Sequence, residues 1–224
     1  MKTFLHAGDD IAPFEMFWLQ LRSKLDNLNL LADDMETADV VVSLSPDAFN
    51  VRKGTSLYAL CHEHSAEEIA TYNPQATVVG FSFVPPYTET TIVELLRPLG
   101  TPPEGIEQAT SYFQALGVTS TEVPDSPGGV CARVVVCLIN EAVSALAEGV
   151  ADAPTIDSAM QLGTHYPRGP LAWADLIGPH RVLGILNALF DFYGEDRYRP
   201  HPLLKRMVMA QKCFHSERTL CTNL

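Results

Sequence analysis

The stretch His62-Glu63-His64 contains three side chains that could bind a metal ion or transfer a proton. Adjacent residues do not share one face of a helix, and a structural zinc site needs about four ligands. No further candidate ligand with suitable spacing lies near these residues in the sequence. The spacing therefore predicts a polar loop before a helix, and no metal site.

A second group of side chains, near the C-terminus, could bind phosphate. Its members are basic: Arg197, Arg199, His201, Lys205 and Arg206. Guanidinium groups bind phosphate oxygens in pairs of hydrogen bonds, although a solvated surface or a salt-bridged edge is the favoured interpretation. The whole chain carries a net charge of -12, which repels nucleic acid and anionic membranes. We therefore expect neither as a partner.

The five cysteines are scattered and form no CxxC pair, which predicts reduced thiols rather than a disulfide framework or a zinc site. The first ten residues, MKTFLHAGDD, lack the apolar run of a signal peptide, and no segment approaches the roughly 20 apolar residues that span a bilayer. These features predict a cytoplasmic protein without a membrane segment.

Strand and helix patterns alternate in the first half of the chain. Phe14, Phe17, Trp18, Leu21 and Leu25 fall on one face of a helix that should pack on a sheet. Further helices are predicted at 65–72 and 103–116, and strands at 2–6, 38–45, 55–60, 77–83 and 91–96, with a possible strand at 28–31. This alternation predicts an α/β layer around a mostly parallel sheet.

After Pro124 the pattern is helical. Ser126 can cap a helix that has Pro127 in its first turn and ends at Gly149. Further helices are predicted at 155–162, 181–193 and 203–211, and the apolar residues Val134, Leu138, Val182 and Leu186 belong either to a core or to a dimer interface. The chain is thus predicted to divide into an α/β domain, 1–123, and an all-α domain, 124–224.

Several motifs in the second half resemble those of the 3-hydroxyacyl-CoA dehydrogenases. They are the segments 125–128 (DSPG), 140–142 (NEA), 156–163 (IDSAMQLG) and 166–170 (YPRGP). The segment 193–200 (YGEDRYRP) is most similar to the second, C-terminal module of two-module members that act in phenylacetate breakdown. The resemblance implies a Rossmann-like half that binds NAD, here shortened, followed by a helical half that dimerises and closes over an acyl-CoA.

The resemblance also implies which residues of the helical half contact a substrate or a second subunit. Arg133, Tyr166, Pro167, Gly169 and Pro170 take the positions that border the acyl-CoA cleft or the dimer contact. A rigid turn fixed by proline and glycine is the simpler interpretation of 166–170.

The catalytic positions implied by the resemblance carry the wrong residues. The family removes the hydroxyl proton with a histidine oriented by a glutamate, and these positions correspond to Ser82 and Ser43. Its SNTSS loop falls near 59–63, and its asparagine corresponds to Ala132. A serine without a neighbouring base cannot accept a proton near neutral pH. His62 remains a candidate for a relocated base.

The cofactor side is altered as well. A dinucleotide site needs a G-x-G-x-x-G turn after the first strand, whereas this chain has Gly8 followed by Asp9 and Asp10. Two carboxylates would repel a diphosphate. The segment between Leu30 and Ala38 is also short for the missing part of such a domain. We therefore predict that no cofactor binds.

These observations favour a non-catalytic family member that acts as a homodimerising, acyl-CoA-binding or partner-binding module. Two alternatives stay open from the sequence. One is a working NAD-dependent dehydrogenase with relocated groups such as His62, and the other is a subunit that pairs with an active relative.

Overall fold

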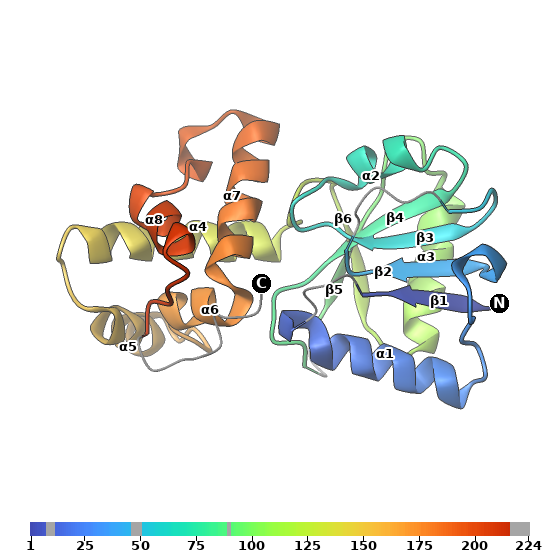
Figure 1. Cartoon of the computed structure of the whole chain (residues 1–224), viewed down its shortest axis with the longest axis horizontal. Coiled ribbons are helices and arrows are strands. Elements are labelled where there is room, and N and C mark those ends of the chain that lie inside the picture. Colours follow the sequence, from blue (N-terminus) through green and yellow to red (C-terminus); the bar gives the residue numbers. More distant parts are fainter. Residues whose placement is uncertain (8–11, 46–50, 89–90, 216–224) are drawn as a thin grey trace. The chain divides into compact units, whose positions relative to one another are not determined.

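Strands and helices alternate up to residue 123, and only helices follow (Figure 1). The computed structural model describes residues 1–7, 12–45, 51–88 and 91–215. Contacts within the chain define two compact units, Met1–Val130 and Cys131–Leu224. The units divide after Val130, whereas the sequence placed a domain boundary after Val123. The predicted fold class, α/β followed by all-α, is confirmed.

The α/β unit is built on a six-stranded sheet in which the strands follow one another in chain order. The strands are β1 (Thr3–His6), β2 (Val40–Ser43), β3 (Ser56–Leu60), β4 (Thr77–Ser82), β5 (Val93–Leu96) and β6 (Ser120–Val123). All neighbouring pairs are parallel except β4 with β5, which is antiparallel. The predicted, mostly parallel sheet is therefore correct.

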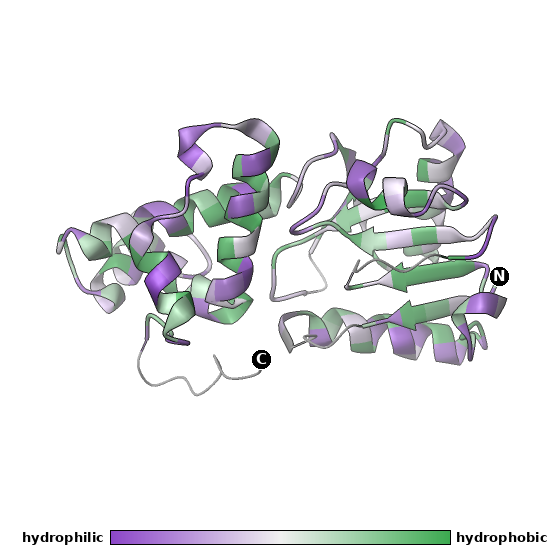
Figure 2. Ribbon diagram, turned by 45° about the horizontal axis from the view of Figure 1, so that its top comes forward, coloured by the Kyte–Doolittle hydropathy of each residue, from purple (hydrophilic) through white to green (hydrophobic). Residues whose placement is uncertain are grey.

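Helices cover both faces of this sheet. On one face, α1 (Glu15–Asn27) and α3 (Pro103–Ala115) pack over an aromatic core that includes Phe17, Tyr58 and Phe113. On the other face, α2 (Ala66–Tyr72) packs on apolar residues of β2, β3 and β4. Figure 2 shows the hydrophobic colour running along the central strands that both layers cover. The buried strands are apolar on both faces, as expected for a parallel sheet.

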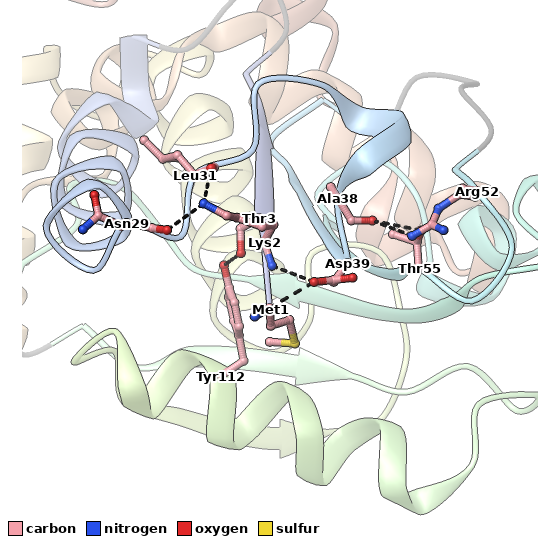
Figure 3. Close-up of polar contacts among 10 residues, drawn as sticks. All are labelled: Met1, Lys2, Thr3, Asn29, Leu31, Ala38, Asp39, Arg52, Thr55 and Tyr112. Atoms are coloured by element: carbon pink, nitrogen blue, oxygen red, sulfur yellow. Dashed lines mark hydrogen bonds and ion pairs between the residues drawn. The ribbon is translucent and has the colours of Figure 1, made fainter.

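On the outer edge of β1, the described residues form one isolated β-bridge and no further strand. The possible strand at 28–31 is only an isolated bridge between Thr3 and Leu31. Thr3 N donates to Leu30 O at 2.7 Å and Ala32 N donates to Thr3 O at 2.8 Å. Polar side chains hold the start of β1 in place, since Lys2 Nζ donates to Asn29 O at 2.8 Å (Figure 3).

Three elements differ from the prediction. Strand β6 was missed because its residues are polar and half-exposed, as is common on a sheet edge. Helix α6 (Pro170–Ile177) was missed because its eight residues follow a proline-rich turn. Helix α4 (Cys131–Ala147) begins five residues after Ser126, later than predicted. Gly128 and Gly129 have positive φ angles of 74° and 59°, which are incompatible with a right-handed helix.

The helical unit places α4 against α6 and α7 (Pro179–Tyr193), with α5 (Ala153–Thr164) and α8 (Pro202–Met209) beside them. Val182 and Leu186 are fully buried in this unit, whereas Val134 is 53% exposed on α4.

Cys61, Cys131 and Cys137 are free thiols, but Cys213 takes part in a disulfide bond, so the prediction of reduced cysteines is wrong for that residue. No helix within the described ranges is long and apolar enough to cross a membrane.

Candidate functional site

The residues at the predicted catalytic positions lie at the carboxyl ends of adjacent strands. His6 pairs in register with Ser43, Ser43 with Ala59, and Ala59 with Gly80. Ser82 lies two residues further along β4. Parallel strands present their carboxyl ends at one edge of the sheet, which is where ligands bind in this fold class.

Ser43 is fully buried at this edge, and its hydroxyl is occupied. It donates to Ser45 O at 2.7 Å and lies 3.0 Å from His6 Nδ1. Because the hydroxyl proton points to a carbonyl, His6 Nδ1 must be the donor in the second contact, and this fixes the tautomer of a neutral His6. The Ser43 side chain therefore holds His6 and the end of β2 and cannot act as a base.

Ser82 is also fully buried and bonded to the backbone. Its hydroxyl donates to Gly128 O at 2.9 Å. The structure does not bring Ser82 and Ser43 together, because β3 lies between their strands and strands are spaced about 4.8 Å apart. The prediction that Ser43 takes the place of the glutamate beside position 82 is thus wrong on geometric grounds.

The carboxylate next to position 82 belongs to Glu94, which the sequence analysis did not identify as a site residue. Glu94 is the direct cross-strand partner of Ser82 in the antiparallel pair β4–β5 and is 4% exposed. Its Oε2 accepts a hydrogen bond from Val130 N at 2.9 Å. One signal could have revealed it: Glu94 is the only charged residue in a four-residue strand that is otherwise apolar and buried.

Three strand ends hold the turn that leads into α4. Cys61 O accepts from Gly128 N at 2.7 Å, Ser82 donates to Gly128 O, and Glu94 accepts from Val130 N. A Cβ atom at Gly129 would collide with Glu94 Oε2. The turn is therefore fastened to three strand ends and packs closely against Ser82 and Glu94.

The motif DSPG contributes a further anchor through Asp125. Its carboxylate accepts from Ala66 N at 2.8 Å and from Glu67 N at 2.9 Å, the first amides of α2. Burial raises the pKa of Asp125, and the two amide hydrogen bonds oppose that rise. Asp125 is thus a structural cap between the turn and α2.

His62 lies near Ser82 but faces the core. It is 5% exposed, its Nε2 lies 2.9 Å from Phe83 O, and its ring packs against Phe14 with 5.2 Å between centroids. His64 instead pairs with Glu68 on the surface at 3.0 Å. Among the described residues, no three histidine, cysteine or acidic side chains come together as metal ligands.

The predicted substrate or dimer residues of the helical unit are held by structural contacts. Arg133 stacks 4.5 Å above the ring of Tyr193 and donates to its hydroxyl at 3.2 Å. Ala132, at the asparagine position, is buried. Of the basic group near the C-terminus, Arg197 pairs with Glu195, and Arg199 lies 3.9 Å from Asp196.

The turn containing Tyr166, Pro167, Gly169 and Pro170 is built around one buried carboxylate. Asp157 accepts from Leu171 N and Ala172 N, both at 2.8 Å, and His215 Nε2 lies 2.8 Å from the same side chain. A Cβ atom at Gly169 would collide with Asp157. These contacts account for the turn as a rigid connection between α5 and α6.

A family model and two curated relatives indicate which family this chain resembles. A family model described as the C-terminal domain of 3-hydroxyacyl-CoA dehydrogenase matches residues 128–217. The chain is 33% identical over 193 residues to a 3-hydroxybutyryl-CoA dehydrogenase of Clostridioides difficile, covering 80% of this chain and 69% of that protein. It is 34% identical over 191 residues to a probable 3-hydroxybutyryl-CoA dehydrogenase of Bacillus subtilis, covering 80% and 67%. The chain belongs to the 3-hydroxyacyl-CoA dehydrogenase family.

Two further similarities bear on the modules of the 3-hydroxyacyl-CoA dehydrogenase family. A 3-hydroxyadipyl-CoA dehydrogenase of Escherichia coli is 42% identical over 115 residues, which is 51% of this chain and 24% of that protein. A crystal structure of (S)-3-hydroxybutyryl-CoA dehydrogenase from Ralstonia eutropha superposes with a TM-score of 0.75 at 22% identity, covering 97% of this chain and 98% of that one. The second similarity supports the fold alone.

The resemblance to the 3-hydroxyacyl-CoA dehydrogenases implies an NAD-binding site. The strand order of the sheet is relevant to whether a dinucleotide could bind. Dinucleotide-binding sheets hold the cofactor where the strand order reverses, with further strands beyond β1. Here the described strands run in sequence from β1 outward, and the far side of β1 carries only the bridge to Leu31. The predicted acidic turn at Gly8, Asp9 and Asp10 lies outside the described residues. The described strands of the α/β unit therefore show no reversal of strand order.

Proposed function

We propose that this member of the family has lost hydride transfer and acts as a dimerising module that binds an acyl-CoA or a protein partner. The observation that carries the proposal is the hydroxyl of Ser82, which is fully buried and donates to Gly128 O. A proton acceptor must reach the substrate, and this group reaches only its own backbone.

The cofactor side supports the same conclusion. The crevice that binds a dinucleotide needs a reversal of strand order, and the described sheet has none. The motif-rich part of the chain, by contrast, is the helical unit, which the family model covers from Gly128. Retained motifs there favour a binding or assembly role over a catalytic one.

Two exposed apolar side chains of the helical unit motivate the dimerisation part of the proposal. Val134 is 53% exposed on α4 and Phe192 is 51% exposed on α7. We propose that a partner covers Val134, either a second copy or an active relative. A dimer mass in solution is expected, and it should be reduced by Val134→Glu but not by Val150→Glu, since Val150 is 70% exposed outside the helices. A monomeric wild-type chain, alone and with such a relative, would contradict this part of the proposal.

A working dehydrogenase is the alternative, and one observation favours it. Glu94 keeps a carboxylate beside position 82, so the loss of one histidine would be the only change at the catalytic pair. His62, whose Nε2 lies 2.9 Å from Phe83 O beside position 82, would be the relocated base on this view.

Assays with acetoacetyl-CoA and NADH distinguish the two functions. We expect no NADH oxidation above the rate without protein and no binding heat with NADH. A CoA ester is titrated separately, and we expect it to bind to the helical unit. Turnover by the wild-type chain would overturn the proposal.

The variant Ser82→His separates loss of the base from loss of the cofactor site. It restores a histidine opposite Glu94, and circular dichroism shows whether it remains folded. If only the base is missing, a folded variant should gain activity. We expect it to stay inactive, because on our proposal the cofactor site is lost too.

A further inference from the structure

A pocket opens at the other end of the sheet from the catalytic positions. Its volume is about 660 Å³, and it is lined by α3, by the start of β3 and by Leu28 and Leu30, which follow α1. Volumes of about 300–1,000 Å³ are typical of sites for small molecules. All of its lining belongs to the α/β unit.

The floor of this pocket consists of aromatic surface with its polar atoms already satisfied. The rings of Tyr58 and Tyr112 lie 5.1 Å apart, and both side chains are buried. Tyr112 Oη donates to Thr3 Oγ1 at 3.1 Å, and the Tyr58 hydroxyl is bonded to Ser56 (Figure 3 shows the first pair). Burial raises the pKa of Tyr58 to about 12, so both hydroxyls are neutral in ordinary buffers. A ligand would meet rings and methylene groups here.

The rim carries carboxylates. Glu104 and Glu107 lie one turn apart on α3, both are exposed, and no ion pair among the described residues includes either. No lysine or arginine lines the pocket.

Several cationic groups at this end of the sheet have other partners. The amino group of Met1, a lining residue, lies 4.0 Å from Asp39, and Lys2 Nζ is bonded to Asn29 O and Leu31 O (Figure 3). Arg52 Nη2 donates to Ala38 O at 3.5 Å, and Arg52 is not part of the lining. The charged side chains among the lining residues are therefore the two glutamates of α3.

We infer that this pocket binds a small organic cation, namely a hydrophobic primary amine with an aromatic body. The body would pack on Tyr58, Tyr112 and Leu30, and the ammonium group would lie at the rim by Glu104 and Glu107. An anionic ligand of the same shape would meet two carboxylates and no lysine or arginine side chain among the lining residues. This inference goes beyond the proposed function and does not depend on it.

The experiment uses three naphthalene compounds of nearly equal shape and different charge. They are 1-naphthylmethylamine, 1-naphthylmethanol and 1-naphthoate, titrated into the full chain by ligand-observed NMR and calorimetry. We expect the amine to bind roughly five-fold or more tighter than the alcohol, and the carboxylate to bind weakest, since exposed charges contribute modestly and are screened by salt. Equal affinities for all three compounds, or no binding of the amine, would overturn the inference.

Charge variants assign the effect to the rim. Glu104→Gln combined with Glu107→Gln should lower the affinity for the amine to that for the alcohol and leave the alcohol unchanged. The matched control is Glu15→Gln with Glu36→Gln, which removes the same charge from exposed positions outside the lining. If both double variants lose the same amine affinity, the loss is due to net charge alone, and the proposed binding site is wrong.

A steric variant tests the pocket itself. Ser111→Trp places a large ring at an exposed lining position of α3, and Gln114→Trp places one on the same helix outside the lining. The first should abolish binding of the amine and the second should not. Unchanged binding by a folded Ser111→Trp variant would show that the amine binds elsewhere.

Discussion

The carboxyl and amino ends of one sheet differ in how their polar groups are used. At the carboxyl end, Ser43, Ser82 and Glu94 are buried and bonded to backbone atoms. At the amino end, Glu104 and Glu107 are exposed beside an open pocket, without ion-pair partners among the described residues. Among the described residues, the polar side chains named at the carboxyl end are thus bonded to backbone, whereas those named at the amino end face a pocket.

The comparison shows how a catalytic position can become structural. A serine at position 82 is small enough to lie under the Gly128–Gly129 turn and to donate to its carbonyl. Glu94 accepts from the same turn. Once these groups satisfy the backbone, a substitution that frees them costs stability, because an unpaired buried polar group costs about 1–3 kcal/mol. Glu104 and Glu107 at the pocket are exposed, so their carboxylates can contact a ligand without leaving a buried polar group unpaired.

The largest effect should come from adding one methyl group to the turn at the carboxyl end. Gly129→Ala combines a positive φ of 59° with a collision against Glu94 Oε2, and we expect a loss of about 3 kcal/mol in the free energy of unfolding. Gly54→Ala is the control, since Gly54 has a φ of 84° and no atom within 4 Å of its Cβ position. It should lose only about 1 kcal/mol. Urea unfolding measures both, and equal losses would show that the turn is not tightly packed.

Sequence patterns predicted the elements whose burial follows from local periodicity. The run at 40–43 is apolar on both faces, and α1 buries Phe17, Leu21 and Leu25 at helical spacing. Such elements are encoded by their own residues. The family was also recognisable, because its motifs are contiguous.

What sequence could not predict depends on neighbours distant in the chain. Glu94 meets Ser82 only because β5 turns antiparallel to β4, and the separation of Ser43 from Ser82 depends on β3 lying between them. The pocket arises between α3 and the segment after α1, neither of which carries a pattern for a cavity. Pairwise spacing along the chain contains none of this information.

At the amino end, the dependence of stability on alkaline pH tests whether the floor of the pocket is buried. The pKa of Tyr58 is raised from 10.0 to about 12, so the unfolded chain loses this proton first as the pH rises. The stability contributed by protonated Tyr58 is complete below pH about 10 and declines toward pH about 12, with a loss of about 1.4 kcal/mol by pH 11. Tyr58→Phe should remove that part of the decline. The free energy of unfolding of both proteins, compared at pH 9 and pH 11, tests this, and parallel declines would mean that Tyr58 is not buried as described.

The smallest effect compares the same substitution at the two ends. Ser82→Ala removes the donor to Gly128 O from a fully buried position, and we expect a loss of about 1 kcal/mol in the free energy of unfolding. Ser111→Ala lies on the exposed face of α3 at the pocket, where alanine has the higher helix propensity, so stability should be unchanged or rise by less than about 0.5 kcal/mol. Chemical denaturation of both variants gives the difference. If Ser82→Ala were as harmless as Ser111→Ala, the buried hydroxyl would not be fastening the turn, and position 82 would be free to face a substrate.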